Sequence, residues 1–142
     1  MVVIKIKRVD KGIILPTYAY KDDAAFDLRS AEDKILAPNE KAILKTGIQV
    51  EIPKDHVGLI WDRSGLAANH GITTLGGVAD SSYRGEIKVI LKNLSNQEFK
   101  INKNDRIAQM IIQPYVKAKI VESENLSETE RSENGLGSTG VK

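Results

Sequence analysis

Apolar and polar residues alternate along much of this chain with the period of two that is typical of half-buried strands. The clearest segment is residues 48–52, where Ile48, Val50 and Ile52 share one face and Pro53 ends the run. Other runs that also predict strands are residues 2–7, 56–61, 86–91 and 110–112. Turn-forming residues separate these runs at short intervals, which favours an all-β barrel or sandwich.

One short helix is predicted within residues 65–69, where the sequence GLAAN follows the apolar run HVGLIW. Gly71 is placed to end this helix, because glycine readily adopts the left-handed conformation. Within the apolar run, Trp61 is expected to pack in the core. His70 is expected to be a polar residue after the helix.

The last part of the chain differs from the rest in composition. Residues 122–142 contain few large apolar side chains and are rich in Ser, Glu, Asn and Gly. Such a segment cannot bury enough apolar surface to offset the entropy lost on ordering. We therefore expect two parts, a β-structured domain over residues 1–121 and a mobile arm over residues 122–142.

Length and charge narrow the function further. The 142 residues suffice for one domain, and the absence of cysteine excludes disulfides and thiolate metal sites. The net charge is +2, but residues 122–142 carry five Glu against one Arg and one Lys, so the remaining residues sum to +5. A mildly basic body suits a phosphate-bearing ligand, whereas no Lys/Arg run indicates nucleic acid. No secretion signal or membrane span is readable, so a cytoplasmic location without membrane association is expected.

The segment GLGSTG, residues 135–140, literally matches the glycine pattern of dinucleotide-binding loops. That pattern requires a strand before it and a helix after it, and only two residues follow here. The position therefore excludes a Rossmann-type site. Two interpretations stay open: a loop that turns N–H groups and hydroxyls toward phosphate, with Arg131 as a charge clamp, or an unstructured glycine-rich end.

Other candidate residues are also ambiguous when each is taken alone. Ser64 either caps the short helix or contacts an anion at the helix start. Asp80, after Gly76 and Gly77, either orients and deprotonates a water or is an ordinary turn residue. In the same segment, Tyr83 is either a ligand contact or half-buried strand packing. Asp27 and Gln109 have the types of side chain that bind a hydrated cation or a phosphate network, but both types are common on surfaces.

Taken together, five segments resemble the five motifs of the trimeric dUTP pyrophosphatases. In chain order they are AAFDLRS, DRSGLA, GGVADSSYRGE, DRIAQ and RSENGLGSTG, from residue 24 to residue 140. The resemblance implies an all-β, compact jelly-roll-like (β-clip) barrel with one short helix and a flexible C-terminal arm. It also implies a homotrimer, with active sites at subunit interfaces that are each closed by an arm from a neighbouring subunit.

The resemblance further implies a reaction, the hydrolysis of dUTP to dUMP and pyrophosphate by attack of water on the α-phosphorus. Asp80 would be the general base, and Asp27 would hold Mg²⁺ through water. Gly77 and its hairpin neighbours Thr74 and Val78 would contact the uracil, while Tyr83 would stack under the deoxyribose. The other implied substrate contacts are Arg63, Ser64, Gly65, Gln109, Arg131, Leu136, Gly137, Ser138 and Thr139.

Some positions depart from the family pattern. Leu136 stands where the arm usually has an aromatic residue, which leaves only dispersion contact with the uracil. Asp62 stands where Pro is common, and Thr74 stands where some relatives carry Asn. Two other functions are considered: a dCTP deaminase, which is usually longer and lacks the Asp80–Tyr83 pattern, and a nucleotide-gated binding module with little catalysis.

Overall fold

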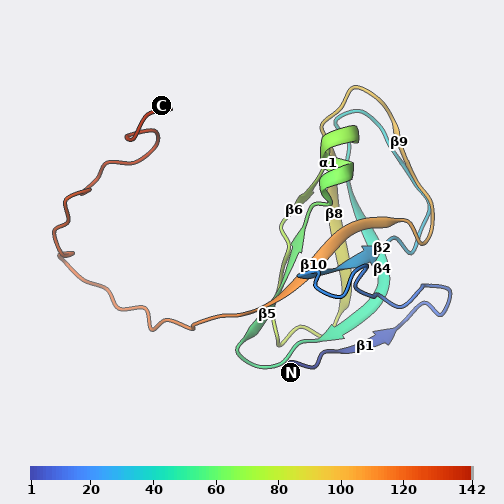
Figure 1. Cartoon of the computed structure of the whole chain (residues 1–142), viewed down its shortest axis with the longest axis horizontal. Helices are drawn as coiled ribbons and strands as arrows, with labels where there is room; N and C mark the ends of the chain where they lie inside the picture. The colour runs from blue at the N-terminus through green and yellow to red at the C-terminus, as the bar shows by residue number, and fades with distance from the viewer. Residues whose placement is uncertain (142) are drawn as a thin grey trace.

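The computed structural model describes residues 1–141, which contain ten strands and one short helix (Figure 1). The elements are β1 (Lys5–Arg8), β2 (Ala25–Arg29), β3 (Lys34–Leu36), β4 (Lys41–Glu51), β5 (His56–Trp61), α1 (Ser64–His70), β6 (Ile72–Leu75), β7 (Val78–Ala79), β8 (Glu86–Asn93), β9 (Phe99–Ile101) and β10 (Arg106–Pro114). The all-β prediction is confirmed, and β1 begins three residues later than the alternation suggested.

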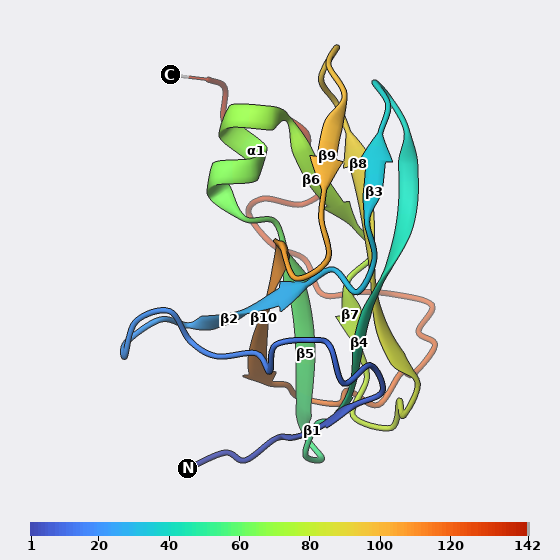
Figure 2. The same ribbon diagram turned by 90° about the vertical axis from the view of Figure 1, so that its right-hand side faces the viewer.

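The strands form three antiparallel sheets rather than one closed barrel within the described residues. The first sheet has the order β1-β4-β8-β6, the second β2-β10-β5-β7, and the third pairs β3 with β9. Figure 2 shows the helix α1 at one end of the molecule, beside β6 and β9. One consequence matters for the site: the consecutive strands β6 and β7 belong to different sheets, so the turn between them crosses from one sheet to the other.

The core consists of the inward faces that the alternation predicted. Ile48 and Val50 on β4 are at most 2% exposed, and Ile52 just beyond the strand is equally well covered. On the neighbouring β8, Ile87, Val89 and Leu91 point to the same interior while Lys88 faces outward. Burial of such side chains stabilises the fold by roughly 1.5–3 kcal/mol each relative to exposure. This local pattern therefore predicts the packing of the first sheet correctly.

The helix α1 occupies Ser64–His70 and ends as predicted at Gly71. Gly71 has φ 65°, and its N–H donates to Ala67 O at 3.0 Å. The N-cap is Arg63, without a side-chain cap bond, so the interpretation of Ser64 as a capping residue is wrong. His70 is the last helical residue, not the first after the helix, and its ring lies 5.0 Å from that of Phe99.

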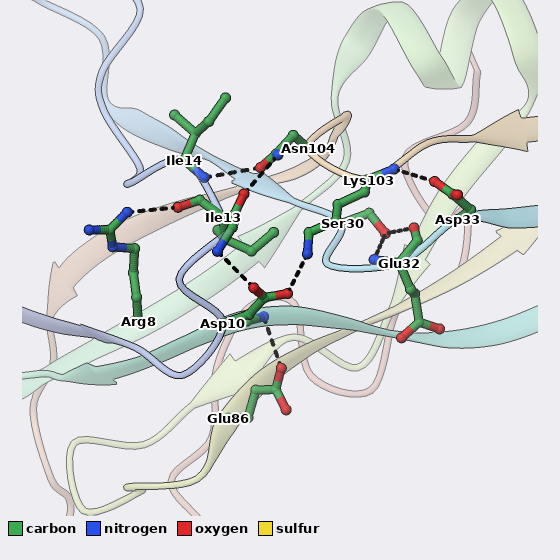
Figure 3. A network of polar contacts seen from close by, with 12 residues as sticks. Arg8, Asp10, Ile13, Ile14, Ser30, Glu32, Asp33, Glu86, Lys103 and Asn104 are labelled. Carbon is green, nitrogen blue, oxygen red and sulfur yellow. Dashed lines mark hydrogen bonds and ion pairs between the residues drawn. The ribbon is translucent and has the colours of Figure 1, made fainter.

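A polar network fastens the long loop between β1 and β2 to the rest of the molecule (Figure 3). Lys103 pairs with Asp10 at 2.7 Å, and Asn104 bonds the loop backbone at both Gly12 O and Ile14 N. The Lys103 and Gly12 bonds to Asp10 hold the pKa of its carboxyl below the ordinary value. These contacts fix a loop whose side chains are mostly exposed, apart from Ile13, which packs in the core.

Residues 115–141 run away from the body and are exposed throughout (Figure 1). They make hydrogen bonds only with one another, apart from Tyr115 N, which donates to Asp55 O at 2.9 Å. Lys142, the last residue of the predicted arm, lies outside the described residues. No helix in residues 1–141 is long and apolar enough to cross a bilayer.

Candidate active site

The corner between β5 and α1 forms one wall of a cleft of about 710 Å³. Strands β2 and β10 supply further lining, because both lie next to each other in the second sheet. Five sequence-predicted site residues line this cleft: Asp27, Arg63, Ser64, Gly65 and Gln109. The structure therefore brings together residues from three of the five motifs within one subunit.

Two arginines share one carboxylate in this cleft. Arg63 Nε lies 2.9 Å from Asp27 Oδ1, and Arg106 Nη1 lies 3.4 Å from Asp27 Oδ2. The Asp27 side chain is only 15% exposed, so the pairs are partly shielded from water. Asp23 and Asp62 also line the cleft, so the positive charge is local: where Arg63 and Arg106 meet, two cations face one carboxylate, and this point of the cleft suits an anion.

Two further parts of the cleft are the first turn of α1 and the side chain of Gln109. Ser64 and Gly65 form the exposed first turn of α1, and a Cβ added at Gly65 would meet no atom within 4 Å. Gln109 Nε2 donates to the carbonyl of Asp62 at 2.6 Å, which ties β10 to the end of β5.

Trp61 also borders the cleft and is 56% exposed, so the expectation that it packs in the core is wrong. It is the last residue of β5, where the strand leaves the covered part of the sheet.

The turn between β6 and β7 depends on two glycines with positive φ. Gly76 has φ 70° and Gly77 has φ 106°, a region that side chains rarely adopt. A Cβ at Gly77 would lie 2.7 Å from Ile60 O, and Gly77 O accepts the Ile60 N–H at 2.8 Å. The turn is therefore pressed against β5 by backbone contacts. Beside it lies a hollow of about 280 Å³ that Thr74, Gly77 and Val78 help to line.

Asp62 holds this hairpin from the other side. Its carboxylate accepts the Thr74 N–H at 2.6 Å, the Thr74 hydroxyl at 2.5 Å and the Thr73 hydroxyl at 2.9 Å. Partial burial by itself raises the pKa of Asp62, but these hydrogen bonds together outweigh it and keep the pKa below its ordinary value. The N–H and the hydroxyl of Thr74, a predicted substrate contact, are thus both engaged by Asp62 within the protein.

Asp80 and Tyr83 line a separate hollow of about 270 Å³ on the far side of the hairpin. Asp80 is exposed, and its side chain accepts no hydrogen bond from residues 1–141. Tyr83 lies in the turn before β8, 46% exposed, with its hydroxyl donating to Glu86 O at 3.1 Å. The interpretation of Tyr83 as strand packing is therefore wrong.

The single subunit does not bring all the predicted residues together. Gly77 and Val78 border both smaller hollows, whereas Asp80 and Tyr83 do not line the cleft that contains Arg63 and Gln109. The arm residues are exposed and line none of these three hollows: Arg131, Leu136, Gly137, Ser138 and Thr139.

Comparison with known proteins decides the family. The dUTPase family model matches residues 11–140. The deoxyuridine 5'-triphosphate nucleotidohydrolase of Nautilia profundicola is 50% identical over 139 residues, covering 96% of this chain and 98% of that protein. The dUTPase of Staphylococcus bacteriophage 80alpha, solved with dUPNHPP, superposes with a TM-score of 0.91 at 30% identity over 98% of this chain and 99% of that one.

The chain belongs to the dUTPase family. The family, the dUTP diphosphatase class and the jelly-roll-like all-β fold expected from the motifs are thereby confirmed. In the sequence, the order of the five motifs indicated the family, the enzyme class and the fold. Arg106 and Asp62 are parts of the site that the sequence analysis assigned no role, because their partners are distant in sequence. The DRIAQ and DRSGLA segments contained both residues, but no local pattern indicated what they contact.

A mutant of the dUTPase from phage phi11 of S. aureus is described as coordinating a structural Mg(II) ion. Within residues 1–141 no three His, Cys, Asp or Glu side chains are grouped to hold a metal. Both oxygens of Asp27 are engaged by arginines. These residues fit a hydrated Mg²⁺ that arrives on a triphosphate, since Mg²⁺ keeps several waters and binds phosphate oxygens. They do not fit a cage made of protein ligands alone.

Proposed function

We propose that this dUTPase hydrolyses dUTP by Mg²⁺-assisted attack of water on the α-phosphorus, which releases dUMP and pyrophosphate. The observation that carries the proposal is the arginine pair that shares Asp27 in the large cleft. A triphosphate brings several negative charges, and fixed cationic donors offset them without reorganisation. When bound with the nucleotide, Mg²⁺ neutralises phosphate charge and orients the phosphate oxygens. In the cell, this reaction would limit uracil in DNA and supply dUMP for thymidylate synthesis in the cytoplasm.

The groups of the chain divide into four roles. Asp80, exposed and without a protein hydrogen bond to its side chain, takes the proton of the attacking water. The turn around Gly77 presents backbone groups to the uracil, and Val78 packs beside them. Tyr83 lies under the deoxyribose and leaves no room for a ribose hydroxyl. Phosphate contacts come from Arg63, Ser64, Gly65 and Gln109, and Asp27 would hold a bound Mg²⁺ through water.

The enzyme acts as a homotrimer in this proposal. Support comes from the separation of Asp80 from the arginine cleft within one subunit, and from an arm that contacts neither. The arm of a neighbour, through Arg131, Ser138 and Thr139, closes over the terminal phosphates, while Leu136 and Gly137 cover the base. Closure excludes bulk water and completes the set of donors only when ligand is present.

The test is pyrophosphate release measured in parallel with dUTP, UTP, dTTP and dCTP, with and without EDTA. We expect turnover of dUTP only, abolished by chelation. Sedimentation of the same sample should give three times the 15.6 kDa chain mass. Ammonia release from dCTP at a comparable rate would instead identify a deaminase. Tight dUTP binding without pyrophosphate release would identify a nucleotide-gated binding module.

A further inference from the structure

Asp62 occupies the point where the large cleft and the hairpin hollow meet, and it lines both. It follows Trp61 at the end of β5 and precedes Arg63, which pairs with Asp27. Its backbone carbonyl and its carboxylate accept hydrogen bonds from opposite sides. The carbonyl accepts Gln109 Nε2 from the cleft side, and the carboxylate accepts donors of Thr73 and Thr74 from the hairpin side.

The hairpin needs such a link because its two strands belong to different sheets. β7 is held on β5 through the pairs Gly58↔Ala79 and Leu59↔Val78. β6 is held on β8 in the other sheet, for example through Thr74↔Leu91. No backbone ladder joins β6 to β5 within residues 1–141. The polar tie from Asp62 to Thr74 therefore sets where the β6 end of the turn stands relative to β5.

The tie between Asp62 and the two threonines consists of short hydrogen bonds. Three donors converge on one partly buried carboxylate, with distances of 2.5 to 2.9 Å. Hydrogen bonds to an ionised acceptor are shorter and stronger than neutral ones. Thr74 is β-branched and thus suited to a strand, so its hydroxyl is presented in a restricted direction. Both atoms of Thr74 that donate to Asp62 are unavailable to a ligand while the tie holds.

We propose that Asp62 is a positioning residue that fixes the Thr74–Val78 hairpin against the phosphate-binding corner and thereby sets the base selectivity of the dUTP site. Thr74 is the anchor of the hairpin in this assignment and not a contact of the uracil. The inference rests on the proposed function, in which the hairpin reads the base. Asp80 directly follows β7, whose pairing with β5 does not involve Asp62, so the tie governs binding of the base more than the chemical step.

The experiment compares Asp62→Ala, Asp62→Asn, Thr74→Val and the double variant Asp62→Ala/Thr74→Val in the full-length enzyme. For Asp62→Ala we expect KM for dUTP to rise about tenfold with kcat nearly unchanged, the scale of one charge-assisted hydrogen bond. The preference for dUTP over dCTP in kcat/KM should fall by a similar factor. Asp62→Asn keeps one acceptor oxygen and should lie between Asp62→Ala and the wild type. Thr74→Val removes one of the three bonds, so its KM should rise roughly threefold.

The double variant should match Asp62→Ala, because both substitutions act through the same contact. Inorganic pyrophosphate serves as a probe of the phosphate corner alone. Its inhibition constant should be unchanged in all variants, since the Gln109 bond is to the Asp62 carbonyl and survives. Asp33→Asn is the matched control: that carboxylate accepts the Lys103 N–H at 2.7 Å, outside all three hollows.

Unchanged KM and selectivity in Asp62→Ala would overturn the inference, and so would an equal loss of pyrophosphate affinity, which indicates general damage. If Asp62→Ala does not fold, Thr74→Val decides, and a wild-type KM in that variant rejects the proposal. Failure of the proposed function has a different signature. In that case the wild-type enzyme releases no pyrophosphate from dUTP, whatever the state of Asp62.

Discussion

The arginine cleft around Asp27 and the glycine hairpin around Gly77 are held in place by different kinds of contact. In the cleft, charged side chains from β2, β10 and the β5–α1 corner meet, and Asp27 joins Arg63 to Arg106. In the hairpin, backbone geometry dominates: Gly77 has φ 106° and its carbonyl bonds Ile60 N–H. Removing a charge from the cleft leaves the backbone in place, whereas adding a single carbon to the turn displaces it.

The charged cleft is suited to the phosphates of a nucleotide, and the rigid turn is suited to its base. Phosphates are recognised by charge, which long side chains deliver. A base edge is recognised by donors and acceptors in a fixed plane, which a rigid backbone turn delivers. The two regions should accordingly respond differently to substitution, with a salt-dependent loss of stability in the cleft and a loss from backbone strain in the turn.

The largest effect is expected at the hairpin end, for Asp80→Asn. Loss of the base should lower turnover of dUTP by roughly 10²–10⁴-fold while binding of dUTP is largely retained. Single-turnover kinetics and calorimetric titration with a non-hydrolysable analogue separate the two. Asp55→Asn, the same chemical change at an exposed turn after β4, is the control. Near-normal turnover in Asp80→Asn would mean that the base lies elsewhere.

Deletion of residues 131–142 tests the proposed closure of the arm over both regions. Turnover should fall by roughly 10²-fold, the scale of losing a preorganised transition-state donor. Thermal unfolding and the trimer should be preserved, because residues 115–141 are exposed and contribute no core. A truncated chain that fails to fold would contradict the description of this segment as an arm.

Gly77→Ala tests the backbone side of the comparison. The added Cβ would stand 2.7 Å from Ile60 O at a φ that alanine rarely adopts. We expect a loss of about 1–3 kcal/mol in the free energy of unfolding, measured by denaturant titration. Gly65→Ala is the matched stability control, since its Cβ meets nothing within 4 Å and alanine favours a helix. Equal destabilisation by both substitutions would remove the distinction between the two regions.

Asp27→Asn tests the charged side. It leaves Arg63 and Arg106 without their shared carboxylate, in a setting only partly open to water. The free energy of unfolding should fall by about 1 kcal/mol at low salt and by less at high salt. Comparison of the two salt conditions measures the electrostatic part directly. A loss that does not depend on salt would assign Asp27 a packing role.

The smallest expected effect is a change in the pKa of Asp62. The pKa of Asp62 should lie below 3.8, its ordinary value, and should rise toward it in Thr74→Val. With a pKa depressed in the folded state, Asp62 contributes stability above the unfolded-state pKa, and this is lost as the pH falls through the folded-state pKa. Carbon-detected NMR titration of the Asp62 carboxyl measures this pKa. A pKa at or above 3.8 in the wild type would show that burial outweighs the hydrogen bonds.

Several features could be predicted from the sequence because they depend on neighbouring residues. The alternation at Ile48–Val50 identified buried faces, and Gly71 identified the end of the helix. Trp61 was placed wrongly, because an apolar run does not reveal which of its members stands at the end of a strand. The division of the strands into three sheets was also not readable, since pairing joins segments far apart in the chain.

By itself, the sequence determined the all-β class, the family and the residue types of the site, because five motifs stand in a recognisable order. Only the tertiary structure decided which of these residues meet. Asp27 finds Arg63 and Arg106 at separations of 36 and 79 residues, and Asp62 finds Thr74 across two sheets. Such contacts depend on how strands pair and stack, which no local periodicity encodes. For the same reason Thr74, a predicted substrate contact by its place next to the glycine turn, has its N–H and its hydroxyl bound to Asp62 in the fold.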